Sequence, residues 1–350
     1  MYKKLFEYLK ENDVFLITSP HNLMYFTGFT GGEGIAVIGK NLKVLITDSR
    51  YAEAAEKESK DFQVINAVPY ISALKDIFLD NNVSTVYYED SYLTVALFKS
   101  IKETTSEFVK FEAASLNLEK LRIIKTELEL NYIKKAESIA CEAYSYVLDK
   151  INDGMTELEI AAEIEYFMKK SGGQKTSFDT IVVSGKRTSL PHGVPSKKKI
   201  SYGDFVTMDF GCVYNGYRSD MTRTVVLGKA SDKQKEIYNV VLDAQLAALD
   251  FLSAGKSAKE ADKVARDVIE KAGYGKYFGH SLGHGVGLLI HELPNLSPKS
   301  EFILEENMVV SCEPGIYIPD FGGVRIEDLV VIKKHGIDNL TYAEKKITEI

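Results

Sequence analysis

The chain has 350 residues, a length that suits about two domains of roughly 150 residues each. Hydrophobic residues make up 45% and charged residues 27%, which is typical of a soluble globular protein and excludes a disordered, collagen-like or coiled-coil chain. The formal net charge of -7 argues against nucleic-acid binding, and it is compatible with an acidic metal pocket.

The cysteine content and the first residues bear on the cellular compartment. Cys141, Cys212 and Cys312 are too few for a disulfide framework and form no CxxC pair, which is typical of a reducing compartment. The start, MYKKLFEYLKEND, has no apolar core of signal-peptide length, and no apolar run approaches the roughly 18 residues that span a bilayer. We therefore expect a cytoplasmic protein with no membrane segment.

Short β-branched and aromatic runs alternate with helical stretches from residue 1 to about residue 118, which indicates an α/β domain. The glycine cluster GFTGGEG at residues 28–34 matches neither phosphate-loop motif and precedes a strand, so we interpret it as a turn. The expected strands are Val14–Thr18, Gly34–Gly39, Lys43–Thr47 and Thr85–Glu89, and the expected helices lie near Ser49–Ser59, Tyr70–Asn81 and Tyr92–Glu103.

Longer helices are expected after about residue 120. Two helices, a group of strands, two further helices and a second group of strands follow one another, so residues 122–228 and 231–335 are predicted to form two similar halves. We expect domains at residues 1–120 and 121–350. Capping boxes are predicted at the helix starts, pairing Thr126 with Glu129, Thr156 with Glu159, Ser231 with Gln234 and Ser257 with Glu260.

The stretch FVTMDFGCVYNGYRSDMTRTVV predicts a β-hairpin, because Asn215-Gly216 suits the positive φ angles of a type I′ turn. This turn places Asp209 opposite Thr222, and Asp220 then lies on the same face as Asp209. The two carboxylates are either exposed on a half-polar strand or converge on a bound cation. The apolar neighbours of Asp209 count against simple exposure, and the hairpin alone leaves both interpretations open.

Four of the six histidines lie in two motifs bounded by glycine and proline. His192 stands in PHG, and the others, His280, His284 and His291, stand in FGHSLGHGVGLLIHE. The glycines between residues 279 and 287 disfavour a helix, so these histidines do not form a helical zinc motif. Any one of them is better explained by a structural role, whereas their clustering indicates a functional site.

Two further glutamates follow later in the chain. Glu313 ends the apolar strand in MVVSCEPGIY, and Arg325 and Glu327 are predicted to share one face of an apolar strand in GGVRIEDLVVI. A buried carboxylate is costly without a compensating charge. That charge can come from the arginine, as a salt bridge, or from a metal ion.

These residues, in this order and in these settings, resemble the aminopeptidase P, prolidase and creatinase family over essentially the whole chain. The resemblance implies a creatinase-like N-terminal α/β domain, which includes TSPHNLMYFTGF and TDSRY, followed by a pseudo-symmetric pita-bread catalytic domain. The matching residues are Asp209 in TMDFG, Asp220 in SDMTRT, His284 in GHGVG, Glu313 in EPGIY and Glu327 in GGVRIED.

The resemblance also implies two divalent metal ions. Asp209 would bind one ion, and His284 with Glu313 would bind the other. Asp220 and Glu327 would bridge both ions. A hydroxide held between the ions would attack the carbonyl of an Xaa-Pro bond, and Glu313 would transfer its proton to the leaving nitrogen. Mn²⁺ is the expected metal, and Co²⁺ and Zn²⁺ are the alternatives.

Further residues match positions around the family's site. His192 and His291 would contact the substrate, and His291 would donate a hydrogen bond to the developing oxyanion. Arg325 and Tyr317 would support the metal ligands from behind. His280 matches a position near the site.

The expected activity is hydrolysis of the Xaa-Pro bond at the N-terminus of small peptides by a homodimer, and the alternative is a prolidase restricted to Xaa-Pro dipeptides. A dipeptidase must hold a free carboxylate, and the segment after His291 offers only Lys299, which is expected at the surface. Phe178 and Tyr217 are candidate walls of a proline pocket. The intact ligand set disfavours a creatinase-like amidinohydrolase and an inactive binding module, and the N-terminal domain disfavours a methionine aminopeptidase.

Overall fold

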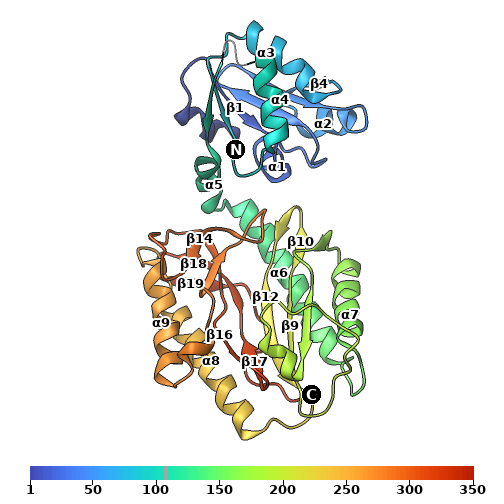
Figure 1. Cartoon of the computed structure of the whole chain (residues 1–350), viewed down its shortest axis with the longest axis vertical. Coiled ribbons are helices and arrows are strands. Elements are labelled where there is room, and N and C mark those ends of the chain that lie inside the picture. The colour runs from blue at the N-terminus through green and yellow to red at the C-terminus, as the bar shows by residue number, and fades with distance from the viewer. Residues whose placement is uncertain (106–108) are drawn as a thin grey trace. The chain divides into compact units, whose positions relative to one another are not determined.

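The computed structural model of the chain describes residues 1–105 and 109–350. It divides into two compact units, Met1–Leu121 and Arg122–Ile350 (Figure 1). Each unit has hydrophobic core clusters of its own. The mixture of helices and strands in both units confirms the predicted fold class. In the described part of the chain, no helix combines the length and the hydropathy needed to cross a membrane.

The first unit is built on a sheet with the strand order β4-β3-β2-β1-β5-β6. Strand β2 runs antiparallel to β1 and β3, and the other neighbouring strands pair in parallel. Buried residues such as Leu16, Val37 and Leu45 make the central strands nearly continuous apolar runs, as expected of strands covered on both faces. The strands are β1 (Asp13–Ile17), β2 (Ile35–Gly39), β3 (Lys43–Thr47), β4 (Gln63–Asn66), β5 (Thr85–Tyr88) and β6 (Lys110–Ala113).

The predicted strands of this unit match β1, β2, β3 and β5 to within one residue. The sequence patterns do not predict β4 and β6, because these four-residue strands lie at the sheet edges and contain exposed and half-buried side chains. The predicted helix Tyr70–Asn81 begins as a 3-10 turn. The helices are η1 (Tyr2–Tyr8), α1 (Pro20–Thr27), α2 (Ala52–Glu58), η2 (Tyr70–Ala73), α3 (Leu74–Asp80), α4 (Val95–Thr105) and α5 (Ser115–Ile123).

Helices of the second unit pack in pairs on separate groups of strands (Figure 1). Helices α6 (Glu127–Leu148) and α7 (Glu157–Lys170) share a core with strands β9 (Phe205–Phe210) and β12 (Met221–Val226). Helices α8 (Asp232–Phe251) and α9 (Ala258–Lys271) share a core with strands β15 (Val309–Cys312) and β18 (Asp328–Lys333). This arrangement confirms the predicted pseudo-symmetry. The capping boxes of α6, α7 and α8 form as predicted, whereas Ser257 caps α9 without a return bond from the Glu260 side chain.

The strands of the second unit form two principal sheets, with the orders β12-β9-β8 and β14-β13-β15-β18-β19. Two further sheets have the orders β11-β10-β7 and β16-β17. Short 3-10 helices are η3 (Gly185–Ser189) and η4 (Gly275–Tyr277). The strands are β7 (Lys175–Thr176), β8 (Ile181–Ser184), β9 (Phe205–Phe210), β10 (Cys212–Tyr214), β11 (Tyr217–Arg218), β12 (Met221–Val226), β13 (Gly283–Gly285), β14 (Glu292–Leu296), β15 (Val309–Cys312), β16 (Gly315–Ile318), β17 (Gly322–Arg325), β18 (Asp328–Lys333) and β19 (Gly336–Asn339).

The predicted hairpin is confirmed in its turn and in its register. The Asn215-Gly216 turn has φ angles of 46° and 81°, and Asp209 pairs with Thr222. Gly211 allows a close approach, since a Cβ atom there would clash with the carbonyl oxygen of Ser219. The hairpin therefore divides into a β9–β12 ladder, which carries the aspartates, and a β10–β11 ladder next to the turn.

The prediction of a single strand over GGVRIEDLVVI is wrong. The chain instead forms β17, which ends at Arg325 and pairs with β16, and β18, which begins at Asp328 and pairs with β15. Glu327 lies between them, and its backbone N–H donates to the carbonyl oxygen of Thr222 at 3.1 Å. An isolated bridge between Thr222 and Glu327 joins the chain to the first half at the point where it leaves the β16–β17 sheet and enters the sheet of β15 and β18.

Candidate metal centre

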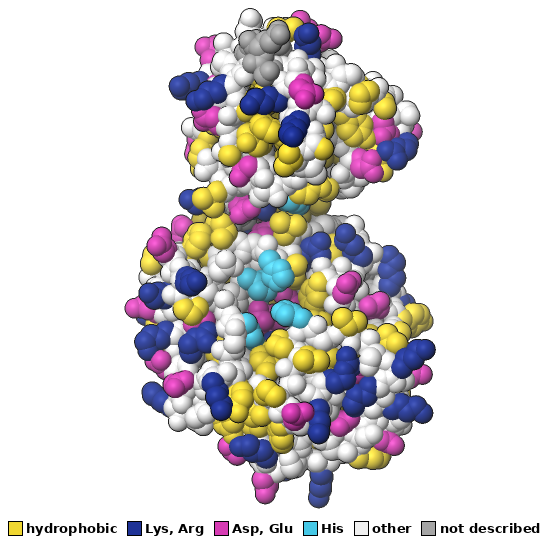
Figure 2. All heavy atoms as spheres, viewed as in Figure 1, with side chains coloured by type: hydrophobic (Ala, Val, Ile, Leu, Met, Phe, Trp, Pro, Cys, Tyr) yellow, Lys and Arg dark blue, Asp and Glu magenta, His cyan; other side chains and the backbone are white. Residues whose placement is uncertain are grey.

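A cavity of about 590 Å³ lies in the second unit. Figure 2 shows histidine side chains grouped around acidic side chains on this face of the unit. The first half contributes Asp209 and Asp220 from the hairpin, and the second half contributes His284, Glu313 and Glu327. All members of the predicted ligand set therefore reach one cavity, although they come from different sheets.

Three of these residues form a cluster with the geometry of a cation site. One ligand atom from each of Asp220, His284 and Glu327 lies within 4.8 Å of the other two. His284 Nε2 lies 3.5 Å from Asp220 Oδ2 and 3.3 Å from Glu313 Oε1. Carboxylate oxygens with an imidazole nitrogen are a donor set that suits Mn²⁺, Co²⁺ or Zn²⁺.

The buried carboxylates of this cluster outnumber the positive charge beside them, which Arg325 supplies at Asp209. Within the described residues, Asp209 Oδ1 and Glu327 Oε1 are buried and accept no hydrogen bond. Burial, together with the repulsion of neighbouring carboxylates, raises the pKa of Asp220 and Glu327 well above the ordinary range. Burial also raises the pKa of Asp209, against the opposing charge of Arg325. Cations bound among these oxygens would remove the penalty, so the residues fit a metal centre.

His284 in β13 and Glu313, which follows β15, orient each other. Ser311 Oγ donates to Glu313 Oε1 at 3.0 Å and accepts from the His284 backbone N–H at 3.1 Å. His284 Nδ1 lies 3.1 Å from the Gly285 carbonyl oxygen, so in the neutral ring the Nε2 lone pair faces the carboxylates. Burial opposes charge on both groups. When Nε2 is protonated it donates to Glu313, and this hydrogen bond outweighs burial, lowering the pKa of Glu313 to about 2 and raising the pKa of His284.

Arg325 holds Asp209 through buried hydrogen bonds. Its Nη2 donates to Asp209 Oδ2 at 2.5 Å, and its Nε donates to Thr222 Oγ1 at 3.0 Å. Its Nη1 donates to Tyr317 Oη at 2.9 Å, and Tyr317 Oη lies 2.9 Å from His280 Nε2. Burial lowers the pKa of His280, which favours the neutral ring, and because Nδ1 lies 2.8 Å from the Ser281 carbonyl oxygen, Nε2 of that ring is the acceptor for the tyrosine. A continuous chain of contacts therefore leads from His280 to Asp209.

His192 and His291 lie at the exposed side of the cavity. His192 follows η3 in a loop, and His291 directly precedes β14. The ring centroid of His291 lies 4.5 Å from that of His284, at an interplanar angle of 77°. Burial and the nearby His284 lower the pKa of His291, which favours a neutral imidazole. Both rings are positioned to contact a molecule that enters the cavity.

Sequence reasoning missed two hydroxyl residues that orient the candidate ligands. Thr222 Oγ1 donates to Glu327 Oε2 at 2.7 Å, and Ser311 Oγ bridges Glu313 and His284. Thr222 stands two positions after Asp220, and Ser311 stands two positions before Glu313. The signal that could have identified them is the alternation of side chains along a strand, which places residues two positions apart on the same face.

Two of the candidate substrate-contacting residues lie outside the cavity lining. Tyr217 is buried elsewhere, where its Oη donates to Glu129 Oε1 at 2.8 Å and its ring centroid lies 5.8 Å from that of Tyr132. Lys299 is exposed and is not among the described residues that line the cavity. Phe178, the other candidate wall of a proline pocket, does line it.

Comparison with known proteins gives a consistent result over both units. Residues 3–124 match the creatinase/prolidase N-terminal domain, and residues 131–334 match metallopeptidase family M24. The Xaa-Pro dipeptidase of Pyrococcus furiosus is 43% identical over 354 residues, which cover 99% of this chain and 98% of that protein.

Solved structures resemble the whole chain as well. That of an Xaa-Pro dipeptidase from Bacillus anthracis has a TM-score of 0.95 at 42% identity, covering 100% of this chain and 98% of that one. The structure of an X-Pro aminopeptidase from Thermotoga maritima MSB8 has a TM-score of 0.93 at 40% identity, and the match covers 100% of this chain and 99% of that one. With the ligand set in one cavity, these similarities show that the chain belongs to metallopeptidase family M24 and carries a creatinase/prolidase N-terminal domain.

Proposed function

We propose that this protein hydrolyses the Xaa-Pro bond at the N-terminus of peptides with two divalent metal ions. The buried carboxylate cluster carries the proposal: in the described residues, oxygens of Asp209 and Glu327 lack a donor, and the cluster shares its cavity with His192 and His291. Family membership supports the reaction class. Relatives named Xaa-Pro dipeptidase and X-Pro aminopeptidase support the substrate class.

The ligand set divides between the two ions. Asp209 would hold one cation, and His284 with Glu313 would hold the other. Asp220 and Glu327 would contact both. The bound cations would polarise the scissile carbonyl and acidify the attacking water. We propose Mn²⁺ first and Co²⁺ or Zn²⁺ next, because the donors are mainly oxygens with one imidazole.

The protein's own groups would bind the peptide and move the proton. The Glu313 carboxylate lines the cavity and stays ionised, so it can accept a proton from the attacking water and pass it to the leaving nitrogen. His291 would donate an N–H to the developing oxyanion, and His192 would hold the peptide near the scissile bond. An Xaa-Pro amide has no N–H to bind, so recognition would depend on shape, with Phe178 as one wall.

The charge of the cavity favours peptides longer than two residues. Arg325 is the only arginine or lysine among the described residues that line it, and its guanidinium already donates to the partners given above. A strict dipeptidase needs a group that holds the free C-terminal carboxylate. Asn295 lines the cavity and offers hydrogen bonds without charge. We therefore favour an Xaa-Pro aminopeptidase over a prolidase restricted to dipeptides.

The test compares two substrates on one preparation. The protein is stripped with a chelator, reconstituted with Mn²⁺, Co²⁺ or Zn²⁺, and assayed with an Xaa-Pro dipeptide and an Xaa-Pro-Xaa tripeptide. We expect metal-dependent release of the first residue from both substrates, faster from the tripeptide. Cleavage of the dipeptide alone would instead identify a prolidase. No cleavage of either peptide, with two metal ions bound, would overturn the proposed substrate class.

We further propose that the protein is a cytoplasmic homodimer. Cys141, Cys212 and Cys312 are buried and form no disulfide in the described structure, which suits a reducing compartment. The family resemblance supports the dimer. Light scattering on the purified protein should give twice the chain mass of 39.1 kDa, and a monomer mass would contradict this proposal.

A further inference from the structure

A buried ion pair lies behind the candidate metal centre. Arg223 Nη2 lies 2.8 Å from Asp328 Oδ1, and both side chains are 0% exposed. Asp328 Oδ2 also accepts from Lys345 Nζ at 2.7 Å and from Asn339 Nδ2 at 2.6 Å. Neither member of the pair lines the cavity, and the proposed hydrolysis gives neither of them a part.

The guanidinium of Arg223 contacts three separate segments of the chain. Its Nη1 donates to the carbonyl oxygens of Thr222 at 2.9 Å and Glu327 at 2.5 Å. Its Nη2 and Nε donate to the carbonyl oxygens of Ala343 at 2.8 Å and Glu344 at 3.0 Å. Arginine presents its donors in a planar, rigid fork, so these bonds fix the relative positions of the segments.

Two of these acceptors belong to the backbone of the metal centre. The Glu327 N–H donates to the Thr222 carbonyl at 3.1 Å, and Thr222 Oγ1 donates to Glu327 Oε2 at 2.7 Å. Arg223 Nη1 donates to both carbonyl oxygens. It therefore links β12 of the first half to the residues that directly precede β18 of the second half. Asp220 lies two residues before Thr222, on the same segment.

The carboxylates on these two segments repel each other when no cation lies between them, and the repulsion tends to separate the segments. We propose that Arg223 and Asp328 are a positioning pair, which holds Asp220 and Glu327 at the separation that a cation needs before the metal binds. The proposal rests on the proposed metal-dependent function. It concerns the assembly of the site rather than the choice of substrate.

Stability alone is a poor reason for this pair. The attraction within a buried ion pair often only balances the cost of removing both charges from water, and apolar residues of similar volume are frequently as stable. What the pair does provide is a fixed geometry, because the planar fork of the arginine sets the directions of its hydrogen bonds. A lysine at position 223 would keep the charge but lose this fork. The Arg223→Lys variant therefore separates charge from geometry.

The experiment measures Co²⁺ binding to the chelator-stripped full chain by visible absorption, which reports coordination geometry independently of activity. Arg223→Lys and Asp328→Asn should each weaken Co²⁺ binding about 10- to 100-fold, as is typical when groups that orient metal ligands are changed. The absorption spectrum should change, and kcat should fall with little change in KM. Tyr238→Phe is the matched control, because it removes a buried 2.8 Å bond to the Lys345 carbonyl. It should lower stability and leave Co²⁺ affinity unchanged.

Folded Arg223→Lys and Asp328→Asn proteins with wild-type Co²⁺ affinity and spectrum would overturn the proposal, and so would an equal loss of affinity in Tyr238→Phe. If neither variant folds, Lys345→Met replaces them, because it removes one bond to Asp328 from a partly exposed side chain. Wild-type binding in that variant would also overturn the proposal. Failure of the wild-type chain to bind two equivalents would contradict the proposed function instead.

Discussion

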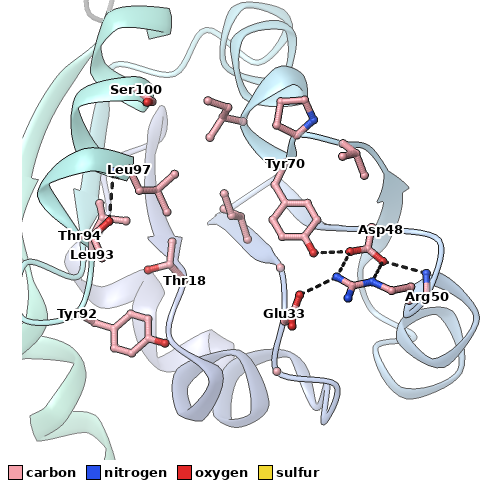
Figure 3. A pocket seen from close by; sticks show the side chains of 16 residues that line it. Thr18, Glu33, Asp48, Arg50, Tyr70, Tyr92, Leu93, Thr94, Leu97 and Ser100 are labelled. Atoms are coloured by element: carbon pink, nitrogen blue, oxygen red, sulfur yellow. Dashed lines mark hydrogen bonds and ion pairs between the residues drawn. The ribbon is translucent and has the colours of Figure 1, made fainter.

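The two units contain cavities of similar size, about 570 Å³ in the first and about 590 Å³ in the second. The first cavity lies where strands of the N-terminal sheet end, with Thr18 directly after β1 and Asp48 directly after β3. Figure 3 shows its polar group, in which Glu33, Asp48, Arg50 and Tyr70 are joined by hydrogen bonds and ion pairs. Both cavities thus combine acidic side chains with apolar walls.

Charge compensation distinguishes the two cavities. In the first, Asp48 accepts from Arg50 Nη2 at 2.7 Å and from Tyr70 Oη at 2.6 Å, and the bonds from Arg50 hold the pKa of Asp48 well below its usual range. In the second, burial and like charges raise the pKa of three carboxylates, and buried oxygens in the described structure have no donor. Cavity size does not identify the reactive site, whereas uncompensated buried charge does.

Removing divalent cations should have the largest effect. Chelation should abolish peptide hydrolysis, because the carboxylates alone cannot acidify water. Restoring Mn²⁺ at about 1,000 times its Kd should stabilise the folded chain by about 4 kcal/mol, measured by urea unfolding. Asp48→Asn should respond to Mn²⁺ as the wild type does, since the first cavity compensates its own charge. If Mn²⁺ does not change the stability of the wild type, the second cavity does not hold uncompensated carboxylates that bind cations, and the contrast between the two cavities is wrong.

Glu313→Gln should have the next largest effect, because it removes the proposed proton carrier from the second cavity. We expect kcat to fall about 10²- to 10⁴-fold, with a much smaller change in KM. Elemental analysis should still find two metal ions for each chain. Glu305→Gln, at an exposed glutamate, is the control and should behave as the wild type. Normal turnover by a fully metallated Glu313→Gln would refute the assigned role.

Asp48→Asn should affect stability in the first unit and leave catalysis unchanged. Because Arg50 lowers the pKa of folded Asp48 below its ordinary 3.8, the contribution of this carboxylate is present above about pH 4 and is lost as the pH falls further. The urea midpoint of the variant should lie below that of the wild type at pH 7, and the gap should narrow at pH 3. A difference in urea midpoint that stays constant with pH would argue against the ion pair of Arg50 and Asp48. Tyr70→Phe should cause a smaller loss of stability than Asp48→Asn.

Lys299→Met should have the smallest effect. Lys299 is exposed and lies outside the cavity lining, so KM for dipeptide and tripeptide should change by less than about twofold. Steady-state kinetics with both substrates provides the measurement. A large rise in KM for the dipeptide alone would identify Lys299 as a carboxylate-binding group and would favour the prolidase.

Local rules account for what sequence analysis predicted correctly. The Asn215-Gly216 turn sets the hairpin register, so the pairing of Asp209 with Thr222 follows by counting. The capping boxes of α6, α7 and α8 form because each uses residues of a single helical turn. The order and settings of the metal-ligand candidates were enough to indicate the family, which the comparisons confirm.

Local rules fail where a residue's neighbours come from elsewhere in the chain. Alternation predicted that Arg325 and Glu327 share one strand, whereas the chain changes sheets between them. The aromatic character of Tyr217 suggested a pocket wall, whereas its hydroxyl bonds to Glu129 on α6. No sequence pattern predicts the hydrogen bond from Arg223 to the Glu327 carbonyl oxygen.

The sequence by itself determined which side chains are available for metal binding and on which elements they stand, because turns, caps and strand alternation act over a few residues. Only the tertiary structure decided their distances and charge environments. The bonds from Arg325 to Asp209 and from Arg223 to Glu327 join residues 116 and 104 positions apart. Such bonds depend on how the two halves pack, so the buried oxygens of the second cavity become apparent only in the folded chain.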